Sequence, residues 1–241
     1  MVNTEHHIIG GTSVEIRWKA IKNLHVGVYP PAGQVRVAAP LSVSLDAVKL
    51  AVLTRMDWVR RKQAQFLSQE RQPQRRFVSG ETHFVFGRPV RLDVIHWAKK
   101  IHRIELVGSD RLSLSVPQDA TSAERRRWLE SWYKRRLKEH VVPRFAHWTT
   151  RLGVRPETWG IRPMKTKWGS CNPDKKIVWL NLELAKKPVR TTEYVLLHEL
   201  AHLISPRHDD RFIQVLDENM PQWRRVRDEL NRYPLAAWND Y

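Results

Sequence analysis

The 241-residue sequence predicts an α+β protein with a β-rich N-terminal region, a long helix and a mixed C-terminal unit. Three patterns carry this prediction. Several short stretches before residue 120 alternate apolar and polar side chains, which is typical of half-buried strands. Apolar side chains recur at helical spacing from residue 121 onward. From about residue 151 the chain combines one strand-like stretch with several helical stretches.

Residues 1–120 are expected to form the β-rich N-terminal region with one helix. Short strands are predicted over the first 40 residues, where prolines and glycines separate the alternating stretches. The helix is predicted over about residues 44–70, because Ser44 can cap it and apolar residues follow at roughly helical spacing. Strand signals return from about residue 77, so a second group of strands is expected before the long helix.

Residues 121–241 are expected to form the long helix and the mixed unit. Thr121 and Glu124 match a capping box at the start of the long helix. A strand is predicted over residues 177–185, which alternate apolar and polar side chains for part of their length. Another helix is expected to begin near Thr191 or the residue after it.

The chain is strongly basic, with 42 Lys and Arg residues against 25 Asp and Glu residues and a net charge of +17. Residues 1–150 hold 26 of the basic residues and 13 of the acidic ones. Such a charge favours anionic partners, and the clusters at 60–62, 125–127 and 134–136 are interleaved with tryptophans, so nucleic acid is one candidate. The structural alternative is that these clusters lie on solvated helix faces.

A single cysteine, Cys171, excludes an intrachain disulfide and requires no oxidising compartment. No apolar run approaches the roughly 18–20 residues that span a bilayer, so a membrane partner is not expected. The N-terminal stretch does not resemble a secretory leader. These features favour a cytoplasmic protein.

His198, Glu199 and His202 form an H-E-x-x-H sequence within a strongly apolar stretch. On a helix, residues four apart share a face, so the two histidines can bind one metal ion. Glu199 can then reach a metal-bound water, whose pKa a metal lowers from about 15.7 to near 7. The alternative is a pair of core histidines that are hydrogen-bonded to backbone carbonyls.

A catalytic zinc site usually takes three protein ligands, and His208 is the favoured third ligand. In a continuous helix His208 would lie about 9 Å beyond His202, too far to share the ion. The Ser205-Pro206 pair disfavours helix continuation, so the chain can turn back and return His208 to the metal. The rival ligands by residue type are Asp209, Asp210 and Glu218.

Four segments around the motif form a recognisable set: "MKTKWGSCN", "YVLLHELAHL", "RHDDRF" and "MPQWRRVRDEL". With them, the chain resembles the YgjP-like metallopeptidases, a family similar to SprT-like and other zincin proteases. The resemblance implies a zincin-like catalytic domain, in which an active-site helix lies beside a small sheet. It also implies a peptidase that acts on a protein or peptide, with one Zn²⁺ held by His198, His202 and His208 and with Glu199 as general base.

Two further functions remain open from the sequence. The same metal site can serve a nucleotide hydrolase that cleaves a phosphoanhydride, because fold and site do not fix the bond that is cleaved. Alternatively, the basic region binds nucleic acid and the zinc is structural.

Several residues near the motif have both a functional and a structural interpretation. Tyr194 can stabilise an oxyanion or be an ordinary helix residue. Trp179 and Asn181 can face a substrate or belong to a structural strand. The lysines at 165 and 167 can meet an anionic group, whereas Trp168 is expected to pack and Cys171 to be a small buried side chain rather than a metal ligand.

Overall fold

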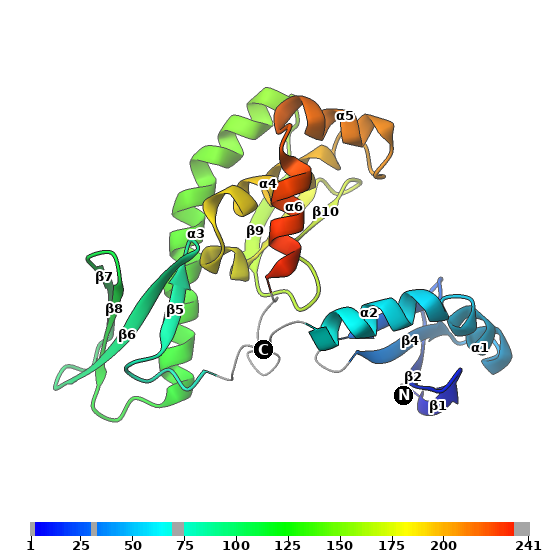
Figure 1. Ribbon diagram of the computed structural model, residues 1–241, viewed down its shortest axis with the longest axis horizontal. Coiled ribbons are helices and arrows are strands. Elements are labelled where there is room, and N and C mark those ends of the chain that lie inside the picture. Colours follow the sequence, from blue (N-terminus) through cyan, green and yellow to red (C-terminus); the bar gives the residue numbers. More distant parts are fainter. Residues whose placement is uncertain (1–2, 30–32, 69–74, 234–241) are drawn as a thin grey trace. The chain divides into compact units, whose positions relative to one another are not determined.

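The computed structural model describes residues 3–29, 33–68 and 75–233 (Figure 1). The fold is mixed α+β, as predicted, and the chain forms two compact units, Met1–Gln72 and Pro73–Tyr241. The predicted boundary after residue 120 therefore falls inside the second unit, where the strands before it and the helix after it share one core. The assignment of catalysis to residues 121–241 stays a prediction.

The first unit packs two helices against a four-stranded sheet with the order β1-β2-β4-β3. Its strands β2 and β4 are parallel and the outer pairs are antiparallel. The bounds are β1 Asn3–Ile9, β2 Thr12–Lys19, β3 His25–Tyr29, β4 Gln34–Pro40, α1 Leu45–Leu53 and α2 Met56–Ser68. Buried valines and isoleucines of the strands and of both helices, together with Ala39 and Met56, form its core.

The prediction of a single helix over about residues 44–70 is wrong, because the structure has two helices there. Ser44 caps α1 as expected, since its hydroxyl accepts from the backbone N–H of Ala47 (3.3 Å). At the break, the hydroxyl and the backbone N–H of Thr54 both donate to the Leu50 carbonyl (2.7 and 2.9 Å), and the Arg55 N–H donates to the Val52 carbonyl (3.0 Å), three residues back. Spacing of apolar residues alone does not reveal such a tightened last turn.

The second unit begins with another four-stranded sheet, β5 Thr82–Val85, β6 Arg88–Trp97, β7 Arg103–Val107 and β8 Arg111–Pro117. Its order is β5-β6-β8-β7, with β6 and β8 parallel. The sheet lies beside the first half of the long helix α3, Ser122–Leu152, where the Tyr133 hydroxyl donates to the Phe84 carbonyl (3.0 Å) (Figure 1). The predicted capping box of Thr121 and Glu124 is present at the start of α3.

The remaining chain builds a three-stranded sheet and three helices (Figure 1). The strands β9 Thr158–Arg162, β10 Gly169–Asn172 and β11 Ile177–Asn181 have the order β10-β11-β9, and the helices are α4 Val189–Ala201, α5 Asp210–Asn219 and α6 Trp223–Arg232. Helix α4 packs against β10, β11, α3, α5 and α6. In the described part of the chain, no helix is long and apolar enough to cross a membrane.

The strand predicted over residues 177–185 is too long. It ends at Asn181, whose side chain accepts from the backbone N–H of Glu183 (3.1 Å) and starts the short 3-10 helix η1, Leu182–Lys186. Helix α4 also begins earlier than predicted, at Val189 directly after Pro188. Proline at this start is compatible with the helix, because a residue there donates no intrahelical hydrogen bond that the missing N–H would remove.

The tip of the β5–β6 hairpin fixes the segment that leads into α4. The backbone N–H groups of Phe86 and Gly87 donate to the carbonyls of Ala185 (2.9 Å) and Lys186 (3.2 Å). Gly87 has a φ of +83°, and a Cβ there would meet the Cα and N atoms of Pro188 at 3.0 Å. Only glycine therefore allows the hairpin to approach the start of α4 so closely.

The substitution Gly87→Ala should lower the free energy of unfolding of the second unit by about 2–4 kcal/mol, because backbone strain and a clash with Pro188 add together. Gly153→Ala is the matched control: its φ is +65° but no atom lies within 4 Å of the added Cβ. The control should cost only about 1 kcal/mol. Urea unfolding of both variants measures the difference, and equal losses would show that the approach to Pro188 is not constrained.

Candidate metal centre

The H-E-x-x-H residues lie at the C-terminal end of α4. The opposite side of this helix belongs to the core, where Leu196, Leu197 and Leu200 have no exposed surface. His198 and Glu199 lie in its last turn, and His202 is the residue that terminates it. Because helical spacing puts positions 198 and 202 on one face, both imidazoles point to the same side, as predicted.

The chain reverses between α4 and α5, and this reversal returns His208 to the other two histidines. Helix α4 ends at Ala201, before the Ser205-Pro206 pair that was expected to break it. Tight turns follow, and the buried Ser205 hydroxyl then donates to the Asp209 carboxylate (2.8 Å). Asp209 in turn caps α5 by accepting from the backbone N–H of Phe212 (3.0 Å).

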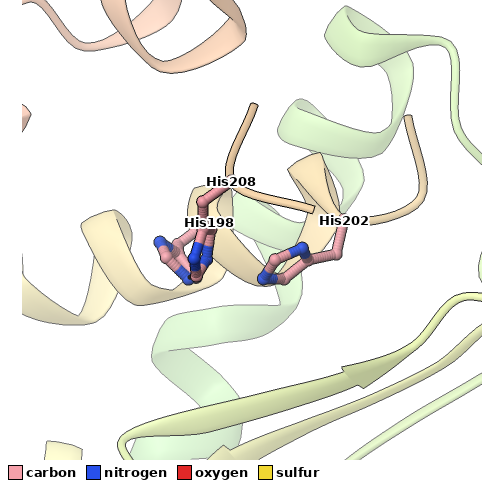
Figure 2. A group of neighbouring side chains, drawn as sticks. All are labelled: His198, His202 and His208. Carbon is pink, nitrogen blue, oxygen red and sulfur yellow. Dashed lines mark hydrogen bonds between the residues drawn. The ribbon is translucent and has the colours of Figure 1, made fainter. Parts of the chain in front are cut away.

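The three histidine rings converge, with their nitrogens turned toward one another (Figure 2). The Nε2 atoms of His198 and His208 lie 3.2 Å apart. One nitrogen from each of the three rings lies within 4.8 Å of the other two. Among the residues that the structure describes, this is the group of His, Cys, Asp or Glu side chains that is placed to hold a metal ion.

Contacts with Tyr194 and Ser205 determine which imidazole nitrogens of His198 and His202 are available to a metal ion. The Nδ1–H of His202 donates to the Ser205 carbonyl (3.3 Å), which leaves the lone pair of Nε2 available. The Tyr194 hydroxyl lies 3.4 Å from Nδ1 of His198, so that ring also presents Nε2 to the cluster. Burial, together with the neighbouring His202 and His208, lowers the pKa of His198 to about 3. A neutral ring with a free lone pair is the form that binds a metal.

The donor set fits a zinc ion. Zinc prefers nitrogen ligands and a tetrahedral arrangement, and a catalytic site leaves one position open. Two nitrogens at about 2.0–2.1 Å from one tetrahedral ion lie about 3.3–3.4 Å apart. The observed 3.2 Å between the Nε2 atoms of His198 and His208 is close to this value. Three imidazoles also satisfy the number of protein ligands that such a site takes.

Phe212 forms an apolar platform beneath the three rings. Its side chain is 1% exposed, and its ring centroid lies 4.7–5.0 Å from the centroids of all three imidazoles. Phe212 follows His208 by four residues and occupies the buried side of α5. Helical periodicity in α5 predicts that Phe212 is buried, but not that it lies under these rings.

Glu199 is almost completely buried and lies against the backbone of β10. It is 6% exposed, and burial raises the pKa of its carboxyl to about 7, an effect that Lys167 opposes. A Cβ at Gly169 would lie 2.6 Å from both Cγ and Oε1 of Glu199. The glycine of the Trp-Gly-Ser segment therefore makes room for the carboxylate, and a glycine within a strand is the sequence signal for such an approach.

These residues border a cleft of about 450 Å³. One part of its lining comes from the β10 region, namely Lys167, Trp168, Gly169, Ser170, Cys171 and Pro173. Helix α4 and the following turn contribute Tyr194, Val195, His198, Glu199, His202, Pro206 and His208, and α6 contributes Arg227, Leu230 and Asn231. The three histidines and Glu199 thus open into one space that is large enough for part of a peptide.

The three alternative metal ligands lie outside the histidine cluster. Asp209 is engaged with Ser205 and with the start of α5. Asp210 is exposed in the first turn of α5, and Glu218 accepts a hydrogen bond from Gln214 (2.7 Å). None of the three belongs to the group formed by the histidines.

Trp179 and Asn181, which the sequence offered as substrate-facing, do not line the cleft. Their strand β11 is the central strand of its sheet, whereas β10 is the edge strand beside α4. Asn181 has no exposed surface, and its amide donates to the carbonyls of Met164 (2.9 Å) and Lys167 (2.7 Å). The residues along the cleft are instead those of the Trp-Gly-Ser segment.

Tyr194 and Cys171, each of which the sequence allows to be functional or structural, also line the cleft. Tyr194 is 5% exposed, stacks on Trp223 with their ring centroids 6.2 Å apart, and contacts His198. Burial raises the pKa of the Tyr194 hydroxyl to about 12. Cys171 is half-buried, and burial, with Glu199 nearby, raises the pKa of its thiol to about 11. The thiol therefore stays protonated near neutral pH, which disfavours metal binding.

The substitution Gly169→Ala should destabilise the second unit by about 1–3 kcal/mol, because the added methyl group overlaps the Glu199 side chain. Urea unfolding of the single variants and of Gly169→Ala combined with Glu199→Ala forms a double-mutant cycle. With the Glu199 side chain removed, the alanine should cost less than about 0.5 kcal/mol. An equal cost in both backgrounds would contradict the close contact.

A family model and two solved structures match this chain. The family model of the YgjP-like metallopeptidase domain matches residues 23–233. Two solved metallopeptidase zymogens are similar: abylysin from Pyrococcus abyssi (22% identity, TM-score 0.35) and jannalysin from Methanocaldococcus jannaschii (21%, 0.34). Each alignment covers 37% of this chain, and 90% and 92% of those chains. A search of curated proteins gives no match. Because the family model spans most of its length, the chain belongs to the YgjP-like metallopeptidase family.

Proposed function

We propose that this metallopeptidase is a zinc-dependent peptidase, in which His198, His202 and His208 hold one zinc ion and Glu199 is the general base. The observation that carries the proposal is the convergence of the three imidazoles beside a buried carboxylate in one cleft. In this view, α4 beside the small sheet of β9, β10 and β11 is a zincin-like arrangement.

The role of the metal follows from its donor set. When bound by three neutral imidazoles with one position open, zinc acts as a Lewis acid that activates water and polarises a carbonyl. The chain prepares this site by keeping His198 and His202 uncharged through burial and by turning their Nε2 atoms inward. The Phe212 platform keeps water away from the rings on the buried side.

Glu199 is suited to move a proton in this cleft. A carboxyl group with a pKa of about 7 accepts and releases a proton near neutral pH with little free-energy cost. Its carboxylate accepts the proton from the attacking water and returns it to the amine that leaves. The contact with Gly169 limits where the carboxylate can lie, so Glu199 needs little reorganisation before the reaction.

The substrate is proposed to be an extended peptide. Strand β10 is the edge strand of its sheet, and its residues line the same cleft as Glu199. An edge strand offers backbone N–H and C=O groups to a peptide that adds as a further strand. The Glu199 carboxylate would then lie beside the peptide backbone.

The two alternative functions receive no comparable support. The family match is to a metallopeptidase domain, not to a nucleotide hydrolase or a nucleic-acid-binding module. Several members of the basic clusters pair with acidic neighbours on the same helix, as Arg126 does with Glu130 (2.8 Å) and Arg136 with Glu139 (2.9 Å). Such pairs are typical of solvated helix faces.

The substitution His208→Ala should weaken zinc binding by at least about 100-fold, because it removes one of three ligands. Isothermal titration of the metal-free protein with zinc measures the change, and wild type should bind one ion. His25→Ala, which removes an exposed histidine of the first unit, is the control and should bind like wild type. Full affinity in His208→Ala would rule out this ligand set.

The substitution Glu199→Gln should keep zinc binding but lower peptide hydrolysis by about 10²–10⁴-fold, because the amide cannot accept the proton. Cleavage of a denatured protein, followed by mass spectrometry, measures the loss, and zinc content is determined on the same sample. Unchanged hydrolysis by the zinc-loaded variant is the result that would remove Glu199 from the mechanism.

A further inference from the structure

The cleft carries more positive than negative charge. Among the described residues that line it, the basic side chains are Lys167 and Arg227 and the acidic one is Glu199. Lys167 belongs to the segment before β10, and Arg227 belongs to α6. Helix α4, which carries Glu199, packs against both β10 and α6. The two cations therefore reach the cleft from different elements that both pack against α4.

Lys167 has a fixed backbone and a free side chain. Its carbonyl accepts from the amide of the fully buried Asn181 (2.7 Å), which also binds Met164. The Lys167 ammonium makes no hydrogen bond or ion pair with any residue in the described part of the chain, although it influences Glu199 through space. A buried amide thus holds the base of an exposed cation beside the cleft.

Contacts with Trp223 and Asp228 also fix the position of the Arg227 side chain. Its Cζ lies 5.2 Å from the ring centroid of Trp223, which is 4% exposed. Nε and Nη2 of Arg227 lie 2.9–3.0 Å from the Asp228 carboxylate, which does not line the cleft. This pairing leaves the Nη1 donors of the guanidinium for another acceptor.

We propose that Lys167 and Arg227 determine substrate specificity and select peptides that carry a carboxylate close to the bond that is cleaved. This inference rests on the proposed function and specifies its substrate class. The Lys167 ammonium has no ion-pair partner among the described residues, and Asp228 engages only Nε and Nη2 of Arg227, so both cations keep donors for an anionic group. Carboxylates bind guanidinium and ammonium groups through charge-assisted hydrogen bonds. The carboxylate can be that of an Asp or Glu side chain or that of the peptide C-terminus.

Binding to the full-length Glu199→Gln variant tests the proposal without cleavage. Four fluorescein-labelled peptides share one apolar sequence. Three have an amidated C-terminus and a central Asp, Asn or Lys, and the fourth has a central Asn and a free C-terminus. Fluorescence anisotropy should show that a peptide with a carboxylate binds at least about fivefold more tightly than the amidated Asn peptide. A preference for the amidated Asp peptide identifies a side-chain site, and one for the free C-terminus identifies a chain-end site.

Charge reversal separates specificity from folding. In the same background, Lys167→Glu with Arg227→Glu should reverse the preference, so that the Lys peptide binds more tightly than the Asp peptide. The control is Lys165→Glu with Arg225→Glu, which makes the same charge change at exposed positions outside the cleft. The control should keep the wild-type preference. A reversal in both pairs would overturn the proposal, because it would reflect net charge alone.

The outcomes distinguish the specificity proposal from the proposed function. If zinc-loaded wild type cleaves all four peptides equally well and the Glu199→Gln variant binds them equally, the specificity proposal fails and the peptidase stands. If carboxylate-bearing peptides bind selectively but are not cleaved, the peptidase fails and the carboxylate site stands.

Discussion

The burial of α4 is the constraint on which the rest of the site depends. Nine of its residues, from Thr191 to Ala201, are buried, so each polar group on it needs a partner or an opening to the cleft. The Thr191 hydroxyl donates to the Pro188 carbonyl (2.7 Å), and Tyr194 meets His198. Glu199 lies against Gly169. At the end of the helix, His198 and His202 face the cleft.

Local rules account for the part of the site that sequence reasoning predicts. Helical spacing places His198 and His202 on one face, and a chain reversal after them returns His208, as the structure shows. The family was predicted from short segments around these residues and is confirmed by the family model. The prediction of where the chain reverses was less accurate, because tight turns end α4 at Ala201, ahead of Pro206.

Tertiary packing and side-chain hydrogen bonds account for what was missed. One predicted helix ends at Thr54, where the turn tightens, and one predicted strand ends at Asn181, whose side chain accepts from the Glu183 N–H; apolar periodicity registers neither feature. The contact of Gly169 with Glu199 joins residues far apart in the sequence. Lys167 and Arg227 meet at one cleft for the same reason. Such neighbours follow from the fold as a whole.

Anomalous X-ray diffraction at the zinc absorption edge, from crystals of the zinc-loaded protein, tests the central claim most directly. We predict one anomalous peak per chain, about 2.0–2.1 Å from a nitrogen of each of His198, His202 and His208, with Glu199 beside the open position. A peak bound by other residues, or one to which His208 contributes no nitrogen, would contradict the account.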